Sequence, residues 1–512
     1  MPRQVPTDDA QVQDFAAALR DLLAWVHGQD GGGRRDNEVV ALVGGHLQEA
    51  ARARSVVGRR LPVFEQVNLQ VALDAWCESP GRTVHVHGIA LPAHYGPVGL
   101  QDLLHGDGLP PVRLSAPDLV DLPSGPAATV ACWSVALLLV HDARGAYVLL
   151  VRGPTRHEEP SLLLEVAGLE TGVAQEVHRE LAELRSRLNV YRGQVLELVQ
   201  TGGGIGVAFP VLPRTDRADV VLPEAVLRRV ERHTVDIADR REQLRAAGQH
   251  LKRGLLLYGP PGTGKTHTTR YVVQRLAGST VLMLSGRTLH LIGEVTALAR
   301  ELQPAVLVLE DVDLVAEDRG YGPGPSPVLF ELLDAMDGSA ADADLLFLLT
   351  TNRADLLEPA LAARPGRVDV AVEIGLPDAP SRRRLFEVYS RGVPLAVTAA
   401  DVDAVVERTE GVTASFLKEL LRRAVLESLA QQDGPLREVT GAHLSLALDD
   451  LLDSTQAVTR ALLGVSGDQA GSPSVDGPGA VPGLYSGRGG HGSHGGFFSA
   501  GYQSSMPASY ED

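Results

Sequence analysis

The sequence predicts an α/β fold in which a parallel sheet carries helices on both faces and is followed by a helical lid. Three short apolar runs lead to this prediction, because continuous apolar strands are typical of a buried parallel sheet. The runs are Leu255–Leu257, Ala305–Leu309 and Leu345–Leu349. The lid is predicted by Leu417–Val425, whose apolar residues share one helix face behind Thr413, a residue able to cap a helix. A mixed α/β region should precede this part of the chain.

The length of the chain predicts several domains. With 512 residues it exceeds what one core supports, so we expect roughly two to four domains. We place a helical or mixed region at 1–115, a small α+β domain at 116–222, the large α/β domain at 223–378 and the helical lid at 379–462. Residues 463–512 are rich in Gly, Ser and Pro, which predicts a disordered tail. A tether whose aromatic residues contact a partner is the alternative.

Charge and composition exclude several classes of partner. The chain has 47 Lys and Arg against 64 Asp and Glu, a net charge of −17 that disfavours nucleic acid or an anionic membrane as the main partner. The apolar stretch Val130–Val140 is shorter than the roughly 20 residues of a membrane helix, so we expect a buried strand. The N-terminus lacks a signal-peptide pattern, and Cys77 and Cys132 stand in no metal-ligand spacing. We expect a cytoplasmic protein with reduced thiols and no membrane contact.

The N-terminal region reads as mixed. Helical spacing is seen in Phe15–Val26 and again in Glu38–Val57, whereas Val67–Leu73 fits a strand and a helix equally well. Thr83–Gly88 alternates as a strand does. This alternation puts two histidines on one face with His94 nearby, but no carboxylate or thiol completes a metal site, so a solvent-facing surface is the better interpretation.

A hairpin and a helix are predicted in the next unit. Asp142–Gly145 is a turn signature between two apolar runs. Apolar residues in Val173–Leu188 lie on one helix face, and Val195–Val199 follows as a strand. Gly202–Gly206 is rich in glycine but opens no clear helix and contains no Lys-Thr pair, so a turn is expected there.

The strongest motif of the chain follows the strand Leu255–Leu257 and precedes the helical stretch Lys265–Leu276. Its glycines let the backbone N–H groups point at phosphate oxygens, Lys265 can neutralise the β and γ phosphates, and the Thr266 hydroxyl can bind Mg²⁺. We include His267, which follows directly, among the nucleotide-binding residues. The motif is a complete phosphate-binding loop, or P-loop, that reads Gly259, Pro260, Pro261, Gly262, Thr263, Gly264, Lys265 and Thr266.

Acidic and amide side chains follow the other two apolar runs. Glu310 and Asp311 come directly after Ala305–Leu309, and Asn352 follows Leu345–Leu349. Carboxylates at the carboxyl end of a buried strand can reach a metal ion and an attacking water. We therefore predict that these three side chains complete an ATP-hydrolysing site, with Asn352 orienting the water.

The chain resembles the AAA family of P-loop ATPases in a third stretch, which looks like that family's second region of homology. This stretch runs from Thr351-Asn352-Arg353 through Leu357–Leu361 to Arg364–Asp369. The resemblance implies that Arg364 and Arg367 reach the γ-phosphate bound by the next subunit, and hence a ring of identical subunits, commonly a hexamer. The residues alone equally fit surface arginines.

The resemblance extends from about Val226 to Leu452. It implies that Asp236 and Ile237, in Val235–Ala238, line the adenine pocket, and that Phe330–Gly338 carries signals between subunits. The lid helix has no arginine at its start, so the resemblance assigns no lid arginine to ATP.

The chain departs from the family pattern at two places. Most relatives carry Asp-Glu where this chain has Glu310-Asp311, so Asp311 is expected to polarise the water and Glu310 to bind Mg²⁺, with swapped roles and slower hydrolysis as open alternatives. Substrate-threading relatives present an aromatic residue where this chain reads Leu291-Ile292-Gly293-Glu294. No HExxH motif occurs, which argues against a fused metalloprotease.

Three functions are compatible with these features. The first is an ATP-hydrolysing ring whose region 1–222 recognises a protein client that the nucleotide cycle moves or remodels. The second is an ATP-dependent scaffold or assembly protein with little turnover, which the reversed acids and the absent aromatic favour. The third is a DNA-acting motor, which the acidic balance disfavours.

Overall fold

The computed structural model describes residues 37–91, 98–106, 109, 112–154, 160–201, 204–313, 331–332, 334, 336, 343–353, 368–431 and 438–453. The predicted helix at Phe15–Val26 and the predicted tail at 463–512 lie outside these residues. His94, Arg364 and Arg367 also lie outside them.

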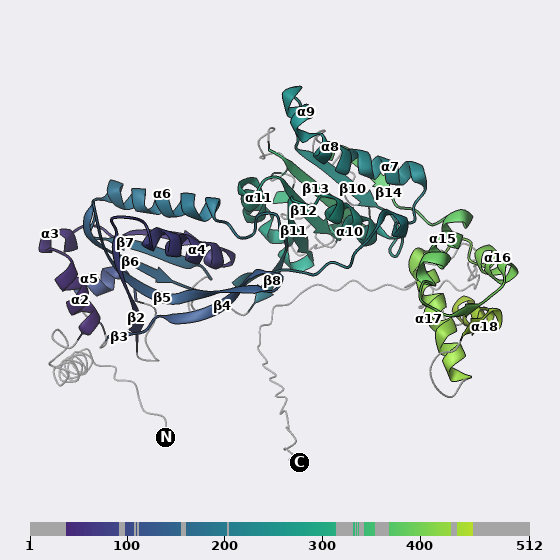
Figure 1. The fold of residues 1–512 in the computed structure, drawn as a ribbon, viewed down its shortest axis with the longest axis horizontal. Coiled ribbons are helices and arrows are strands. Elements are labelled where there is room, and N and C mark those ends of the chain that lie inside the picture. The colour runs from purple at the N-terminus through teal and green to yellow at the C-terminus, as the bar shows by residue number, and fades with distance from the viewer. Residues whose placement is uncertain are drawn as a thin grey trace, which may run out of the picture. The chain divides into compact units, whose positions relative to one another are not determined.

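The first part of the chain forms one seven-stranded antiparallel sheet, here the N-terminal sheet (Figure 1). Its order is β1-β7-β6-β5-β2-β3, and β4 pairs with the first half of β5. The predicted hairpin is confirmed, because Asp142 at the end of β5 pairs with Gly145 at the start of β6. The strands are β1 (Val57–Leu61), β2 (Thr83–Ala90), β3 (Arg113–Ser115), β4 (Asp118–Gly125), β5 (Ala128–Asp142), β6 (Gly145–Arg152) and β7 (Leu162–Ala167).

Helices cover both faces of the N-terminal sheet. On one face, Leu138 and Val140 of β5 share a core with α4 and α6, and on the other Leu137 and Leu139 share a core with α2 and α5. Burial on both faces explains why this strand is a continuous apolar run rather than an alternating one. The helices are α2 (Glu38–His46), α3 (Glu49–Arg52), α4 (Gln66–Cys77), α5 (Leu100–His105) and α6 (Thr171–Arg187).

The structure corrects the predicted organisation of this region. The boundary at 115/116 divides a single sheet, since β2 from the first predicted unit pairs with β5 from the second. Such pairing joins segments about 50 residues apart, which local patterns cannot reveal. The ambiguous stretch Val67–Leu73 is helical, within α4. The predicted helix Glu38–Val57 is instead two short helices followed by β1.

The second sheet contains the predicted parallel strands and has the order β14-β10-β13-β12-β11-β8-β9. Neighbouring strands run parallel from β14 to β8, and β9 is antiparallel to β8. The three predicted strands are confirmed as β10, β12 and β13, and β13 lies between the other two. The strands are β8 (Val195–Thr201), β9 (Gly204–Ala208), β10 (Arg253–Tyr258), β11 (Thr280–Ser285), β12 (Ala305–Glu310), β13 (Leu345–Thr351) and β14 (Val370–Glu373).

Helices also cover both faces of the second sheet. Leu307 and Leu309 of β12 pack with α11, whereas Val306 and Val308 pack with α10 and α7. Figure 1 shows α10 and α11 beside these strands. The helices of this part are α7 (Glu224–His233), α8 (Val235–Asp239), α9 (Arg241–Ala246), α10 (Lys265–Arg275) and α11 (Ile292–Glu301), with short 3-10 turns at Val63–Glu65, Arg217–Asp219 and Gly286–Leu291.

The second sheet begins earlier in the chain than the predicted domain boundary at 222/223. β8 pairs with β11 through Val195↔Val281, and its hairpin partner β9 forms the edge of the sheet. The apolar pattern of 195–199 identifies a strand but not the sheet to which it belongs.

The helical lid is confirmed. Its core is formed by buried side chains such as Phe386, Phe416 and Leu420. Thr413 caps α17 by accepting a hydrogen bond from the N–H of Phe416 at 3.4 Å. The elements are α15 (Ala379–Tyr389), β15 (Leu395–Ala396), α16 (Ala399–Arg408), α17 (Ala414–Ala430), β16 (Val439–Thr440) and α18 (Gly441–Leu452).

Candidate functional site

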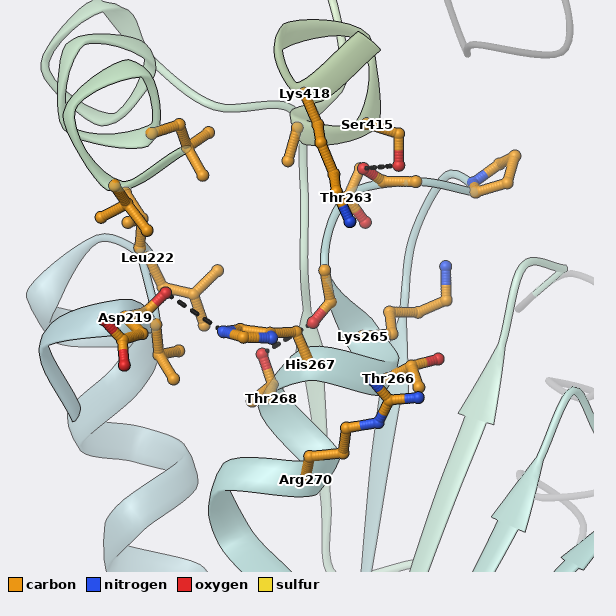
Figure 2. Close-up of a pocket in the computed structure, with 18 of the residues that line it drawn as sticks. Asp219, Leu222, Thr263, Lys265, Thr266, His267, Thr268, Arg270, Ser415 and Lys418 are labelled. Carbon is orange, nitrogen blue, oxygen red and sulfur yellow. Dashed lines mark hydrogen bonds between the residues drawn. The ribbon is translucent and has the colours of Figure 1, made fainter. Parts of the chain in front are cut away.

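A pocket of about 560 Å³ lies at the carboxyl edge of the second sheet. Because parallel strands end at the same edge, the loops after β10, β12 and β13 meet there. The pocket is lined by the P-loop residues Pro261 to Thr266 and by part of the lid (Figure 2). Asp311, which follows β12, and Asn352, which follows β13, also line it. The structure therefore brings Lys265, Asp311 and Asn352 together from three separate motifs, whereas Glu310 does not line the pocket itself but contacts Thr266, which does.

The P-loop requires glycine at two tight positions. Gly259 has φ 146°, and a Cβ built there would lie 2.2 Å from the carbonyl oxygen of Ile374. Gly262 has φ 77°, and a Cβ there would lie 2.9 Å from Ser415 Oγ. No other residue type fits either position without backbone strain. The loop thus keeps its N–H groups and the start of α10 open to an anion.

Lys265 is buried beneath this loop. Its Nζ donates hydrogen bonds to the carbonyl oxygens of Gly259 at 2.8 Å and Pro260 at 2.9 Å. Burial lowers the pKa of Lys265, and the negative charges of Asp311 and Asp313 offset part of this effect. The two hydrogen-bond partners of the ammonium group are neutral carbonyls, which do not neutralise its positive charge. The site therefore fits an anion such as a nucleotide phosphate.

Glu310 faces the Thr266 hydroxyl. Burial and the neighbouring charge of Asp311 raise the pKa of Glu310, whereas Arg270 and a hydrogen bond with Thr266 lower it in part. Its Oε1 is buried and has no hydrogen-bond partner among the described residues. A buried carboxylate oxygen beside a threonine hydroxyl is the donor set that Mg²⁺ prefers. These two side chains fit the predicted magnesium site.

Asp311 has an unusual backbone conformation. Its φ is 51°, the only positive value among non-glycine residues in the described part of the chain. The conformation is held by a hydrogen bond from its N–H to Thr350 Oγ1 at 3.1 Å. Asn352 Nδ2 donates to Asp311 Oδ1 at 3.4 Å. Strained backbone persists where the surrounding structure enforces it, often at functional sites.

Asp313 positions Asn352 and was not singled out from the sequence. This buried carboxylate accepts hydrogen bonds from Thr351 Oγ1 at 2.9 Å and from the N–H of Asn352 at 3.1 Å. It ties the end of β13 to the end of β12. The sequence did contain a signal for this residue, because Asp313 is the third acid in the run Glu310-Asp311-Val312-Asp313.

The adenine-pocket prediction is corrected. Asp236 and Ile237 lie in α8, outside the residues that line the pocket, and Asp236 lies 3.9 Å and 3.8 Å from Arg228 and Arg240. The segment Asp219–Leu222 lines the pocket instead. Both segments pair an aspartate with β-branched residues, and only the tertiary packing distinguishes them.

Three elements hold this segment at the pocket. His267 Nε2 lies 3.2 Å from the carbonyl oxygen of Asp219, as Figure 2 shows, which places His267 in the site as predicted. The Asp219 carboxylate pairs with Arg391 of the lid. Arg217 donates to Glu231 of α7 at 2.8 Å. The segment that ends in Asp219–Leu222 is therefore connected to α7, α10 and the lid.

The predicted roles of Arg364, Arg367 and Phe330–Gly338 are not tested by the described residues. Arg364 and Arg367 lie outside the described residues, as does most of Phe330–Gly338. The described residues contain no cluster of three or more His, Cys, Asp or Glu able to hold a metal ion. Among the helices that the structure describes, none is long and apolar enough to span a membrane.

Residues 255–376 match the family model described as ATPase family associated with various cellular activities (AAA). The chain is similar to the ATP-dependent zinc metalloprotease FtsH 1 of Conexibacter woesei, with 32% identity over 290 residues, which covers 52% of this chain and 44% of that protein. The ATP-dependent zinc metalloprotease FtsH of Mycobacterium tuberculosis is 33% identical over 255 residues, covering 47% of this chain and 33% of that protein. The match thus spans less than half the length of these curated relatives.

Among solved structures, the AAA domain of FIGL-1 matches 48% of this chain and 89% of its own length, at 23% identity and a TM-score of 0.40.

Proposed function

We propose that this chain, whose residues 255–376 match the AAA family model, binds ATP with Mg²⁺ in the pocket described above and hydrolyses it. The observation that carries the proposal is the convergence of Lys265, Glu310, Asp311 and Asn352 at one edge of the second sheet. A scaffold that only needed glycine in a turn would have no reason to place two carboxylates and an amide opposite a buried lysine.

Each side chain has a role that follows from its surroundings. The P-loop N–H groups and Lys265 would bind the phosphates, and Thr266 and Glu310 would hold the metal ion, whose charge would counter that of the phosphates. Asp311 accepts a hydrogen bond from the attacking water, and Asn352, held by Asp313, orients that water. Glu310 and Asp311 exchange these roles in the alternative assignment.

The proposal includes a ring of identical subunits, commonly a hexamer in the family, in the cytoplasm. Arg364 and Arg367 would act on the nucleotide of the neighbouring subunit, as the family resemblance implies. The two cysteines are free thiols, which supports a reducing compartment. Region 1–222 would recognise a protein client that the cycle of hydrolysis moves or remodels.

Remodelling without threading is favoured by the position of Leu291 and Ile292. The exposed fractions of these residues are 9% and 0%, because both, at the start of α11, pack into the core that α11 shares with the second sheet. Buried side chains cannot grip a polypeptide in a central pore. This observation also favours the second candidate function, a scaffold that uses ATP to assemble and turns it over slowly.

Steady-state ATP hydrolysis should be measured for the wild type, Lys265→Ala and Asp311→Asn. We expect each substitution to lower turnover by about a hundredfold or more, because each removes a group that stabilises developing charge or activates water. Asp121→Asn is the matched control, since Asp121 is exposed on β4 and does not line the pocket.

Size-exclusion chromatography with and without ATP separates the two candidates. A wild type that assembles with ATP but hydrolyses it no faster than Lys265→Ala would support the scaffold and contradict the enzyme. Hydrolysis stimulated by DNA would instead support a DNA-acting motor.

A further inference from the structure

The lid contributes one positively charged side chain to the nucleotide pocket. Lys418 lies in the second turn of α17 and lines the pocket together with Lys265 and Arg270. Figure 2 shows its side chain running from the lid towards the P-loop at Thr263. The resemblance to known ATPases assigned no lid arginine to ATP, and Lys418 was given no role in the sequence analysis.

The start of α17 is attached directly to the P-loop. The N–H of Ser415 donates to the carbonyl oxygen of Gly262 at 3.0 Å, and Ser415 Oγ donates to the same oxygen at 3.3 Å. Lys418 follows Ser415 by three residues, a spacing that places both on one face of the helix. The contact at Ser415 therefore fixes the distance between Lys418 and the loop that binds phosphate.

The surroundings of Lys418 differ from those of the other basic residues of α17. Arg422 bonds to Glu419 at 2.6 Å and 2.7 Å, and Arg423 pairs with Glu419 at 3.0 Å and also with Asp450. In the described part of the chain, Lys418 forms no ion pair with a carboxylate. Glu419 is adjacent to Lys418 but is held by the two arginines.

We infer that Lys418 binds the phosphate groups of the nucleotide and so links the lid to the bound ATP. The inference rests on the proposed ATP binding and deepens it. An exposed lysine with no carboxylate partner among the described residues, held over a phosphate-binding loop, gains a charge-assisted hydrogen bond only when a phosphate is present. Because α17 is part of the lid, its position becomes sensitive to whether a nucleotide is bound.

Binding of a fluorescent ATP analogue should be measured for the wild type, Lys418→Ala and Lys418→Arg, together with the thermal unfolding of each protein with and without ATP. Loss of one charge-assisted hydrogen bond should raise the Kd of Lys418→Ala about tenfold, and Lys418→Arg should retain most of the affinity. The Tm without nucleotide should not change, whereas the increase in Tm caused by ATP should be smaller in Lys418→Ala.

Arg422→Ala is the matched control, because it removes a positive charge one turn away on the same helix, at a residue that does not line the pocket. If Lys418→Ala and Arg422→Ala both bind the analogue within twofold of the wild type while Lys265→Ala loses binding, the inference about Lys418 is wrong and the proposed ATP site stands. If the wild type itself does not bind the analogue, the proposed function fails instead.

Discussion

The N-terminal sheet and the second sheet both contain seven described strands with helices on both faces, and the second carries the pocket that is lined by Lys265, Asp311 and Asn352. The antiparallel strands of the N-terminal sheet end alternately at opposite edges. The parallel strands of the second sheet end together, so their loops bring Lys265, Glu310 and Asn352 to one place. Strand direction therefore decides whether polar residues that are distant in sequence meet.

The polar cluster of the N-terminal sheet shows the contrast. The Asp142 carboxylate accepts hydrogen bonds from Tyr147 at 2.7 Å, Arg144 at 3.0 Å and Arg82 at 3.3 Å. Both arginines also pair with Glu180. Burial would raise the pKa of Asp142, but these hydrogen bonds outweigh it and lower the pKa. Every charge in this cluster has a partner, whereas Glu310 keeps a buried oxygen without one among the described residues. The first arrangement stabilises the fold, and the second is available to a ligand.

The largest expected effect is on the stability of the N-terminal sheet. Asp142→Ala leaves the buried guanidinium of Arg82 without one of its two carboxylate partners, which should cost about 3–5 kcal/mol. Thermal unfolding followed by fluorescence of the tryptophans, Trp76 among them, would report this loss. Asp121→Ala, at an exposed position of β4, should change stability little. Equal effects of the two substitutions would contradict the structural role of the cluster.

A cluster with the same character lies beside the second sheet, on α7 and α10, and provides a pH-dependent test. Burial would raise the pKa of Glu231, but hydrogen bonds from Arg217, Tyr271 and Arg228 lower it to about 2. A carboxylate with a lowered pKa stabilises the folded state above its unfolded pKa of about 4.5, and this contribution is lost as the pH falls towards about 2.

Glu231→Gln should therefore lower the free energy of unfolding by about 2 kcal/mol at pH 7, since it removes hydrogen bonds to a charged group. It should also make stability less dependent on pH between 4.5 and 2. Unfolding measured across this range in both proteins tests the prediction. Parallel curves for the two proteins would show that Glu231 does not have the assigned pKa.

The smallest effect has the opposite sign and concerns the strained residue of the pocket. Asp311→Gly relieves a positive φ, so the domain should gain about 1 kcal/mol of stability while ATP turnover falls. Ser285→Gly is the control, because Ser285 is the last residue of the neighbouring strand β11, has φ −142° and should lose stability as glycine. If Asp311→Gly is no more stable than the wild type, the positive φ of Asp311 does not lower the free energy of unfolding.

Together these substitutions test whether the two kinds of cluster differ as proposed. Changes at the fully paired clusters should reduce stability without a direct effect on ATP binding. Changes at the strand ends of the second sheet should reduce turnover and leave stability unchanged or higher, which is the usual cost of a site arranged for function.

Sequence patterns predicted the second sheet well because its signals are local. Buried strands such as Ala305–Leu309 and Leu345–Leu349 are continuous apolar runs, and the P-loop is a contiguous motif whose three glycines all have a positive φ. The lid helix carried its own cap at Thr413. In the N-terminal region the hairpin at Asp142–Gly145 was correct, since a short turn also depends only on its own residues.

Patterns failed where the structure depends on contacts between distant segments. The adenine-pocket segment was assigned to Asp236 and Ile237 because the motif is short and occurs in similar form at 219–222. Lys418 was overlooked because its place in the pocket depends on where α17 lies relative to the P-loop, and its neighbours in sequence do not reveal that position.

By itself, then, the sequence determined the P-loop, the acids at the end of the apolar run Ala305–Leu309 and the helical lid, because each depends on residues close together in the chain. Only the tertiary structure decided that β8 and β9 complete the second sheet, that Asp219–Leu222 lines the pocket and that a lysine of the lid points into it. The physical reason is that pairing and packing select among segments with equivalent local patterns, and that selection is made by the whole core.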